Sequence, residues 1–258
     1  MKVAIFGSEG FLGSELYNVL KEYFDIQGIT RSNYTSKKGE NFDIFINANG
    51  NSRRYWANNN IIEDFDASTI SVYKTILDFK TKLYIYISSA DVYLMHDSIL
   101  KTKENDVIDY SKLSPYGFHK YLSELIVKRY SKSFLILRCS ALIGKNMKKG
   151  PIKDLIDGKP LFITIDSKLQ FITTNEVAKI IMELVQKNIK NEIYNVGGIE
   201  TVLIRHLEKI INKKIEMHRN AEKQVYELDI SKLRKVFQLK TSVEYLKDVF
   251  GIMKGDFK

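Results

Sequence analysis

The stretch that decides the fold of this 258-residue chain is Gly7-Ser8-Glu9-Gly10-Phe11-Leu12-Gly13. It follows the short apolar run Lys2–Phe6 and leads into Phe11–Phe24, where apolar residues recur at helical spacing. Glycines at such a strand-to-helix turn allow a sharp bend and leave bare backbone amides at the helix N-terminus, where a diphosphate binds. The motif therefore predicts a dinucleotide-binding turn, with candidate cofactor contacts at Gly7, Ser8, Gly10, Phe11, Leu12 and Gly13.

Strand-like and helix-like segments alternate around this turn up to about residue 140. Several of the expected strands are apolar throughout, as parallel strands buried on both faces tend to be. They are Lys2–Phe6, Ile26–Thr30, Phe42–Asn47, Leu83–Ser88 and Phe134–Arg138. The helices expected between them are Phe11–Phe24, Ile61–Phe79 and Pro115–Tyr130. This alternation predicts an α/β fold with a Rossmann-type, doubly wound parallel sheet.

The pattern changes after Gly144, where glycine and proline become more frequent. We expect a dinucleotide-binding domain over residues 1–142 and a small C-terminal substrate-binding lobe over residues 143–258. The later part is expected to contain a helix at Asn175–Gln186, a strand at Glu192–Val196 and a helix near Ile199–Ile211. Residues of about 176–198 are expected to return to the sheet of the first domain.

Composition and charge narrow the class of protein. The net charge of +9 is spread along the chain, and no run alternates basic with aromatic residues, so a nucleic-acid partner is not expected. No apolar run approaches the roughly 18 residues that a membrane span needs. The single cysteine, Cys139, cannot form an internal disulfide and fits a reducing, cytoplasmic location. Without further cysteines or suitably spaced histidines, no metal site is expected.

The end of the second expected strand bears on the choice of cofactor. NAD sites usually place an acidic residue there, whereas NADP sites place an arginine near the 2′-phosphate. The sequence here is Gly28-Ile29-Thr30-Arg31-Ser32, which contains no acid. Arg31 and Ser32 can bind a phosphate through a charged fork and a hydroxyl, although Arg31 can also be a solvated loop residue. The sequence favours NADP, with NAD as the alternative.

A candidate catalytic set lies at Ser114-Pro115-Tyr116-Gly117-Phe118-His119-Lys120. The four-residue spacing puts the Tyr116 phenol and the Lys120 ammonium on one helix face, where the ammonium is expected to lower the pKa of the phenol. Tyr116 could then exchange a proton with a carbonyl/alcohol pair while hydride moves to or from nicotinamide. Ser89, at the end of the preceding strand, is the expected third member. Ser88 beside it is expected to contact the cofactor.

These motifs resemble the extended short-chain dehydrogenases/reductases, in the NAD-dependent epimerase/dehydratase family that modifies nucleotide-diphosphate sugars. Ser-Ser-x-x-Val-Tyr at 88–93 and Ser-Pro-Tyr-Gly-x-x-Lys at 114–120 carry the likeness. The resemblance implies that the catalytic residues are Ser89, Tyr116 and Lys120, and that Ser89, Asp91 and Tyr116 meet the substrate. It also implies that the strand and loop from Leu137 to Gly144 close over nicotinamide. The remaining candidate cofactor contacts are Ala48, Asn49, Gly50, Tyr116, Lys120, Cys139 and Ser140.

The chain departs from the family pattern in several places. Only about a dozen residues separate Arg31 from Asp43, so a strand and helix usual on the adenine side are expected to be missing. Ser68 stands where the family often has an asparagine near the cofactor. Ala141 replaces an asparagine that commonly contacts substrate phosphate, and Leu169 replaces a frequent arginine. The residues that bind a substrate diphosphate are therefore expected to differ from those usual in the family.

The resemblance leaves more than one reaction open. Dehydratases of the family follow the catalytic hydroxyl with an Asp-Glu pair, whereas this chain has Ala90-Asp91, which argues against dehydration. Asp91 is either a second acid facing the sugar or a cap of the following loop. Arg31, the short lobe and the change at Ala141 favour an NADPH-dependent reductase of a keto sugar, for example a 4-keto-6-deoxy sugar. The alternatives are a 4-epimerase with tightly held NAD and a non-catalytic NADP-sensing protein.

Two of the expected helices, Ile61–Phe79 and Pro115–Tyr130, have apolar residues on more than one face. A helix that packs only on a sheet needs one apolar stripe, so the wider surface indicates a second packing partner. Family members commonly dimerise through these helices, which predicts a homodimer. The alternative is that the lobe or a loop covers this surface. The residues concerned are Ile70, Val72, Tyr73, Ile76, Leu77, Tyr121, Leu122, Leu125, Ile126 and Val127.

Overall fold

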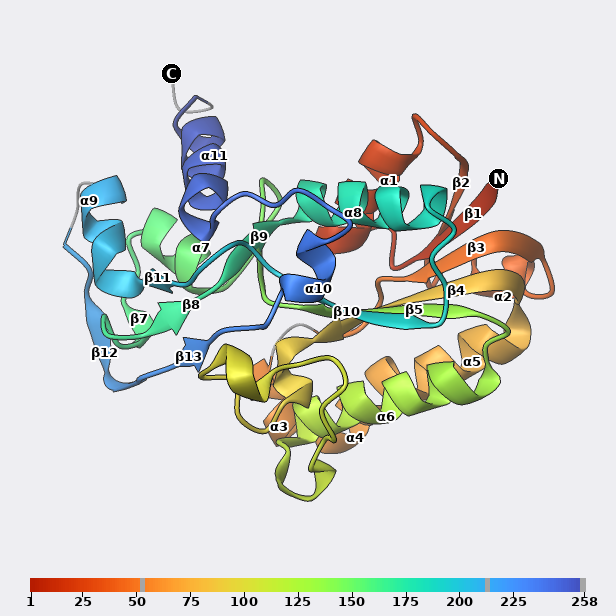
Figure 1. Cartoon of the computed structure of the whole chain (residues 1–258), viewed down its shortest axis with the longest axis horizontal. Helices are drawn as coiled ribbons and strands as arrows, with labels where there is room; N and C mark the ends of the chain where they lie inside the picture. Colours follow the sequence, from red (N-terminus) through yellow and green to blue (C-terminus); the bar gives the residue numbers. More distant parts are fainter. Residues whose placement is uncertain (52–53, 212–213, 256–258) are drawn as a thin grey trace.

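A computed structural model describes residues 1–51, 54–211 and 214–255 (Figure 1). Its central sheet has six strands in the order β10-β5-β4-β3-β1-β2, and every neighbouring pair is parallel. The strands are β1 (Lys2–Phe6), β2 (Asp25–Ile29), β3 (Asn41–Asn47), β4 (Lys80–Ser89), β5 (Phe134–Cys139) and β10 (Glu192–Val196). The predicted Rossmann-type α/β fold is confirmed.

Helices cover both faces of this sheet (Figure 1). On one face lie α1 (Phe11–Leu20) and α8 (Thr174–Gln186), and on the other lie α5 (Ser71–Asp78) and α6 (Pro115–Tyr130). The start of α6 is set by its sequence, because Pro115 suits a first helical turn and the Ser114 hydroxyl accepts a hydrogen bond from the Gly117 amide at 3.2 Å. This start fixes where the residues of the first turn lie.

On the β2 side, the sheet has fewer strands than that of a larger Rossmann domain. A single short helix, α2 (Tyr34–Lys37), connects β2 to β3, and β3 pairs with the opposite side of β1. Among the described residues no strand lies beyond β2. The short segment after Arg31 thus leaves the adenine side of the sheet without the extra strand and helix.

The predicted single helix Ile61–Phe79 is wrong in detail. The structure divides it into α4 (Ile61–Phe65), a π-helical turn η1 (Asp66–Ile70) and α5. Such wide turns interrupt α-helices when local side chains compete for the backbone. The Ser71 hydroxyl does so here, donating to the Ala67 carbonyl at 2.6 Å. Helical periodicity alone does not reveal this interruption.

The C-terminal lobe consists of short elements that pack beside the carboxyl ends of the sheet strands (Figure 1). Its helices are α7 (Pro151–Ile156), α9 (Leu207–Ile211), α10 (Ser231–Arg234) and α11 (Ser242–Gly255). Its strands are β6 (Ala141–Ile143), β7 (Leu161–Ile163), β8 (Lys168–Leu169), β9 (Phe171–Thr173), β11 (Val202–Leu203), β12 (Met217–Glu222) and β13 (Val225–Tyr226). Between these strands the chain returns to the sheet as α8 and β10.

The predicted helix near Ile199–Ile211 is also wrong in its first half. Residues Val202–Leu203 form β11, and a 3-10 turn at Ile204–His206 precedes α9. The Ile204 amide donates to the Ser167 carbonyl and the Arg205 amide donates to the Ile165 carbonyl. Because these donors bond to a neighbouring loop, an α-helix cannot include them. Within the described part of the chain, no helix is long and apolar enough to cross a membrane.

Candidate active site

The glycine turn forms one wall of a cavity of about 440 Å³ at the end of β1. Gly7 has a φ of +85°, a conformation that glycine adopts without strain, and Gly10 caps α1 without any side-chain bond. The helix therefore presents bare amides, as a diphosphate requires. Predicted cofactor residues from three separate segments meet at this cavity, namely Gly7, Gly10, Arg31, Ser32, Ala48, Asn49 and Gly50.

Two charged side chains line the same cavity. Arg31 makes no hydrogen bond or ion pair within the described part of the chain, so its guanidinium is available to a ligand. The loop that carries it is held by Asn33, whose side chain bonds to the Thr30 amide and the Gly28 carbonyl. The sequence analysis missed Glu9, which lines the same cavity as Arg31.

Several predicted cofactor residues use their side chains elsewhere. Leu12 and Cys139 belong to the hydrophobic core, and burial raises the pKa of the Cys139 thiol to about 12. Phe11 lies beside Gly144, and Ser8 packs against Gly28 of β2. These residues could contact a dinucleotide only through their backbone or through a part of the side chain.

The Ser88 hydroxyl is engaged in the core, so the predicted contact of Ser88 with the cofactor would have to use its backbone. Ser88 Oγ donates to Glu124 Oε1 at 2.6 Å, and Arg138 bonds both oxygens of the same carboxylate, with Nη2 at 2.7 Å from Oε2. Burial opposes the charge of Arg138, but Glu124 outweighs this and raises the pKa of the guanidinium. The three residues form a buried structural network that joins α6 to β4 and β5.

Ser140 behaves differently from Ser88. Its Oγ is buried and has no hydrogen-bond partner among the described residues. A buried hydroxyl without a partner costs about 1–3 kcal/mol, which a ligand can offset. Ser140 is not among the lining residues of the cavity at the glycine turn, and its hydroxyl lies near Gly197, so the fit to a dinucleotide rests on the bare amides of the glycine turn.

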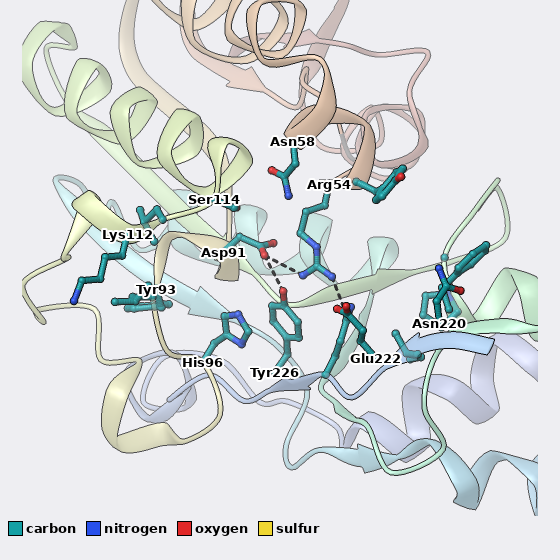
Figure 2. A pocket seen from close by; sticks show the side chains of 18 of the residues that line it. Arg54, Asn58, Asp91, Tyr93, His96, Lys112, Ser114, Asn220, Glu222 and Tyr226 are labelled. Atoms are coloured by element: carbon teal, nitrogen blue, oxygen red, sulfur yellow. Dashed lines mark hydrogen bonds and ion pairs between the residues drawn. The ribbon is translucent and has the colours of Figure 1, made fainter. Parts of the chain in front are cut away.

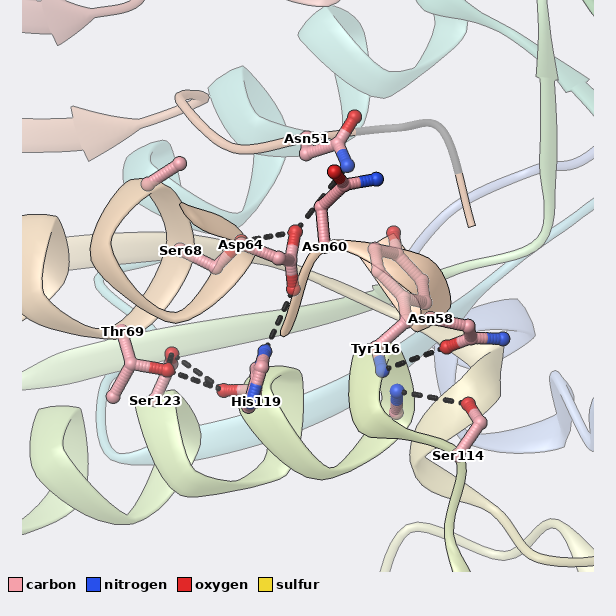
Figure 3. A network of polar contacts seen from close by, with 12 residues as sticks. Asn51, Asn58, Asn60, Asp64, Ser68, Thr69, Ser114, Tyr116, His119 and Ser123 are labelled. Carbon is pink, nitrogen blue, oxygen red and sulfur yellow. Dashed lines mark hydrogen bonds and ion pairs between the residues drawn. The ribbon is translucent and has the colours of Figure 1, made fainter. Parts of the chain in front are cut away.

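Tyr116 and Lys120 lie on α6 next to the end of β4, where Ser89 is found. The Tyr116 amide is held by Asn58 Oδ1 at 3.1 Å (Figure 3). Lys120 Nζ donates to the Ile87 carbonyl at 3.0 Å. A Cβ added at Gly50 would lie 3.4 Å from the same nitrogen, so Lys120 adjoins the dinucleotide cavity. The structure thus brings the predicted catalytic residues together.

The protonation of this set differs from the sequence expectation. Burial lowers the pKa of Lys120 to about 8, because the ammonium is removed from water. Burial, followed by the nearby Asp91 carboxylate, raises the pKa of Tyr116, and a hydrogen bond with Ser89 opposes this. The expected lowering by Lys120 is therefore outweighed in the protein alone. Tyr116 is a phenol at neutral pH.

A buried polar network joins α6 to α4 and to the loop at Asn51 (Figure 3). His119 Nδ1 lies 2.7 Å from Asp64 Oδ2, and the other carboxylate oxygen accepts hydrogen bonds from Asn51 at 3.3 Å and Ser68 at 3.4 Å. Asn51 follows the cofactor loop and His119 precedes Lys120. The network therefore links α6 to the loop that lines the dinucleotide cavity. No motif in the sequence indicated it.

A second cavity of about 860 Å³ lies between the end of β4 and the C-terminal lobe (Figure 2). Asp91 reaches it and bonds to Arg54 at 3.1 Å and to the Tyr226 hydroxyl at 2.8 Å. His96 stacks on Tyr226 with ring centroids 3.8 Å apart. Sequence analysis identified Asp91 but missed these partners. No short motif connects them.

The polar lining of this cavity bears on the substrate diphosphate. Leu169 is buried in the core and Ala141 belongs to β6, so neither offers a polar group to a phosphate. The cationic side chains among the described lining residues are Arg54 and Lys112, with His96 as a further ring nitrogen. Carboxylates come from Asp91, Asp154 and Glu222. No group of His, Cys, Asp or Glu in the described ranges could hold a metal ion.

The fold and the paired cavities define a Rossmann-type protein of the extended short-chain dehydrogenase/reductase class. The model of the NAD dependent epimerase/dehydratase family matches residues 3–197, and the chain belongs to this family. A protein of Methanocaldococcus jannaschii, "Putative UDP-glucose 4-epimerase", is 28% identical over 186 residues, 64% of this chain. The match spans 60% of that relative's length.

Solved structures show the same fold at low sequence identity. UDP-glucuronic acid 4-epimerase of Bacillus cereus, in complex with a fluorinated sugar nucleotide and NAD, superposes with a TM-score of 0.77 at 19% identity, covering 99% of both chains. dTDP-4-dehydrorhamnose reductase of Bacillus anthracis, in complex with NADP, superposes with a TM-score of 0.78 at 17% identity. That match covers 96% of this chain and 98% of the other. Epimerases and reductases thus share this architecture.

Proposed function

We propose that the protein is an NADPH-dependent reductase of a nucleotide-diphosphate keto sugar, such as a 4-keto-6-deoxy sugar. The observation that carries the proposal is the position of the catalytic set between the two cavities. Lys120 adjoins the dinucleotide cavity through Gly50, and Ser89 is bonded to Asp91 of the larger cavity. A cofactor and a sugar bound in these cavities would meet at Tyr116.

The residues of the set have separate tasks in this reaction. When bound, a nicotinamide dinucleotide supplies hydride to the carbonyl carbon. Tyr116 gives its phenolic proton to the carbonyl oxygen and is left as phenolate. Lys120 lies four residues further along α6, where its ammonium would favour the phenolate, and it can also bind the nicotinamide ribose. Ser89 positions the substrate oxygen beside Tyr116.

NADP rather than NAD is proposed because Arg31 lines the cavity and bonds to no other described residue. A guanidinium binds a 2′-phosphate through two parallel hydrogen bonds. The catalytic set, with Tyr116 and Lys120 both present, argues against a protein that only senses NADP.

A 4-epimerase with tightly held NAD is the second candidate. Glu9 favours it, because a carboxylate in the dinucleotide cavity can accept hydrogen bonds from a ribose hydroxyl, as in NAD sites. The two candidates differ in stoichiometry, since an epimerase regenerates its cofactor in each turnover. A reductase consumes one reduced cofactor per product.

The test is to incubate the purified protein with a series of nucleotide-diphosphate keto sugars and to follow the absorbance of NADPH and NADH. We expect consumption of NADPH with at least one of them. Tyr116→Phe should lower the rate by about 10²–10⁴-fold while cofactor still binds, since only the proton donor is lost. Activity of Tyr116→Phe close to that of the wild type would remove Tyr116 from the mechanism. Inversion of a sugar nucleotide without loss of NADPH would establish the epimerase instead.

A further inference from the structure

Asp64 of α4 carries a carboxylate that is buried beneath the dinucleotide site, with a side chain that is 0% exposed. Its Oδ2 lies 2.7 Å from His119 Nδ1, and its Oδ1 accepts hydrogen bonds from Asn51 Nδ2 at 3.3 Å and from Ser68 Oγ at 3.4 Å (Figure 3). A carboxylate is costly to remove from water unless its oxygens have donors. These contacts therefore fix the carboxylate, and the carboxylate in turn fixes its three donors.

The three donors come from separate segments of the chain. Asn51 directly follows the cofactor loop, residues 48–50, which lines the dinucleotide cavity. Ser68 lies in the π-helical turn η1, and His119 lies on the catalytic helix α6. Asp64 thus joins the end of the cofactor loop to the helix that carries the catalytic tyrosine and lysine.

The position of the cofactor loop matters most at Gly50. This residue has a φ of +137°, a conformation that glycine adopts without strain. A Cβ added there would lie 3.4 Å from Lys120 Nζ and 3.9 Å from Ser68 Oγ, so the bare backbone of the loop lies against both residues. A shift of Asn51 would move this backbone relative to Lys120.

The start of the cofactor loop has an anchor of its own. Asn49 Nδ2 donates to the Ala67 carbonyl at 3.1 Å and to Ser71 Oγ at 3.3 Å. The contact between Asn51 and Asp64 secures the other end of the loop. Loss of that contact would therefore act on the end that lies against the catalytic lysine and would leave the start in place.

The segment that carries Asp64 is itself fixed to the catalytic helix. In α3 (Arg54–Asn59), the helix just before α4, Asn58 Oδ1 accepts a hydrogen bond from the Tyr116 amide at 3.1 Å. Together with the contact to the α6 histidine, this bond holds α3 and α4 against the first turns of α6. Asp64 therefore presents Asn51 with an acceptor whose position is set by the catalytic helix.

We propose that Asp64 is a positioning residue for cofactor binding, which holds the cofactor loop against α6 so that Gly50 stays beside Lys120 at the dinucleotide cavity. The inference rests on the proposed dinucleotide site and is the same for NADP and NAD. It predicts that Asp64 acts on cofactor affinity through Asn51, in addition to any contribution of its buried pair with His119 to stability.

The experiment measures the affinity for NADPH and NADH by fluorescence titration, and the free energy of unfolding by chemical denaturation. Asn51→Ala removes the contact with the loop and keeps Asp64 paired with His119. We expect it to weaken the binding of both cofactors by about threefold to tenfold, the size usual for residues in direct contact, with little change in the free energy of unfolding. Asp64→Asn should weaken binding at least as much and should also destabilise the fold, because it disturbs all three contacts.

A reciprocal exchange separates positioning from stability. Asn51→Asp alone places two acceptors against each other and should weaken the binding of both cofactors more than Asn51→Ala does. Combined with Asp64→Asn, it provides a donor and an acceptor in exchanged positions. We expect this double variant to bind both cofactors within about threefold of the wild type.

Ser242→Ala is the matched control, because Ser242 is 1% exposed and its hydroxyl bonds to the Phe171 amide and the Glu200 carbonyl, away from both cavities. It should lower the free energy of unfolding without changing cofactor affinity. Wild-type affinity in Asn51→Ala, or a double variant that binds as weakly as Asp64→Asn, would overturn the inference and leave the dinucleotide site standing. A wild-type protein that binds neither NADPH nor NADH would contradict the proposed site itself.

Discussion

The charge of Lys120 changes with pH close to the physiological range. Its pKa is lowered to about 8 by burial, so the side chain is an ammonium below that pH and an amine above it. Nζ adjoins the dinucleotide cavity, and a hydrogen bond from a charged donor contributes about 1.5–3 kcal/mol.

We therefore expect the affinity for NADPH to fall as the pH rises through about 8. In Lys120→Met the affinity should be weaker at neutral pH by about tenfold or more and should not change across this range. Fluorescence titration of NADPH from pH 6.5 to 9.5 measures both effects. An equally steep fall in Lys120→Met would assign the pH dependence to another group.

Arg31 and Glu9 are the two residues that we propose set the choice between NADP and NAD, because both line the dinucleotide cavity. Arg31→Ala should weaken the binding of NADPH by about 1.5–3 kcal/mol, since the contact with the 2′-phosphate is lost. The affinity for NADH should stay nearly unchanged. Glu9→Gln is the matched variant, and it should weaken the binding of NADH if the Glu9 carboxylate binds the ribose. Binding curves for both cofactors with the three proteins measure this. Equal affinity of the wild type for NADPH and NADH would contradict the NADP preference.

At the scale of elements, the first turn of α6 is the most constrained segment. Gly117 lies against the Asp91 backbone, and an alanine there must push the helix and the end of β4 apart. We expect Gly117→Ala to lower the free energy of unfolding by about 1–3 kcal/mol and to lower kcat. Gly251→Ala, in α11 with open space around it, should leave kcat unchanged and stabilise by at most about 1 kcal/mol. Chemical denaturation and rate assays compare the two, and a harmless Gly117→Ala would contradict the close approach.

The elements also explain which parts of the site the sequence could predict. Tyr116 and Lys120 share one helix at a fixed spacing, and Ser89 ends a strongly apolar strand. The local sequence pattern was therefore sufficient to predict that these three residues lie close together. Arg54 lies 37 residues and Tyr226 lies 135 residues from Asp91 in the chain. Their meeting depends on how the lobe packs, which no local pattern encodes. The start of α9 was mispredicted for the same reason, because tertiary hydrogen bonds set it. The π-helical turn after α4 was missed for a different reason, because it goes with a local hydrogen bond from the Ser71 side chain that helical periodicity does not reveal.

At the scale of the whole molecule, α5 and α6 lie side by side on one face of the sheet (Figure 1). The rings of Tyr73 and Tyr130 join them, with centroids 5.0 Å apart. Val72 and Val127 face the core, whereas Leu77 and Leu125 are 63% and 41% exposed. The two helices thus keep apolar residues on their outer side, which no other described part of the chain covers.

We propose that these helices pair across a two-fold axis in a homodimer. Light scattering at micromolar concentration should give twice the chain mass of 29.9 kDa. Leu77→Arg and Leu125→Arg, introduced singly, should each yield monomers. Val107→Arg, at a 98% exposed position in a loop, is the control and should remain dimeric. A wild-type monomer, or a dimer that survives both helix variants, would contradict this interface.

The proposed reductase function requires that hydride pass from a consumed cofactor to a sugar carbonyl. The most direct measurement uses NADPH carrying deuterium at the transferred position, with a nucleotide-diphosphate 4-keto-6-deoxy sugar and mass spectrometry of the product. The account predicts one deuterium in each product sugar, one NADPH consumed per product, and loss of both in Tyr116→Phe. Product formed without deuterium, while NADPH is conserved, would contradict it.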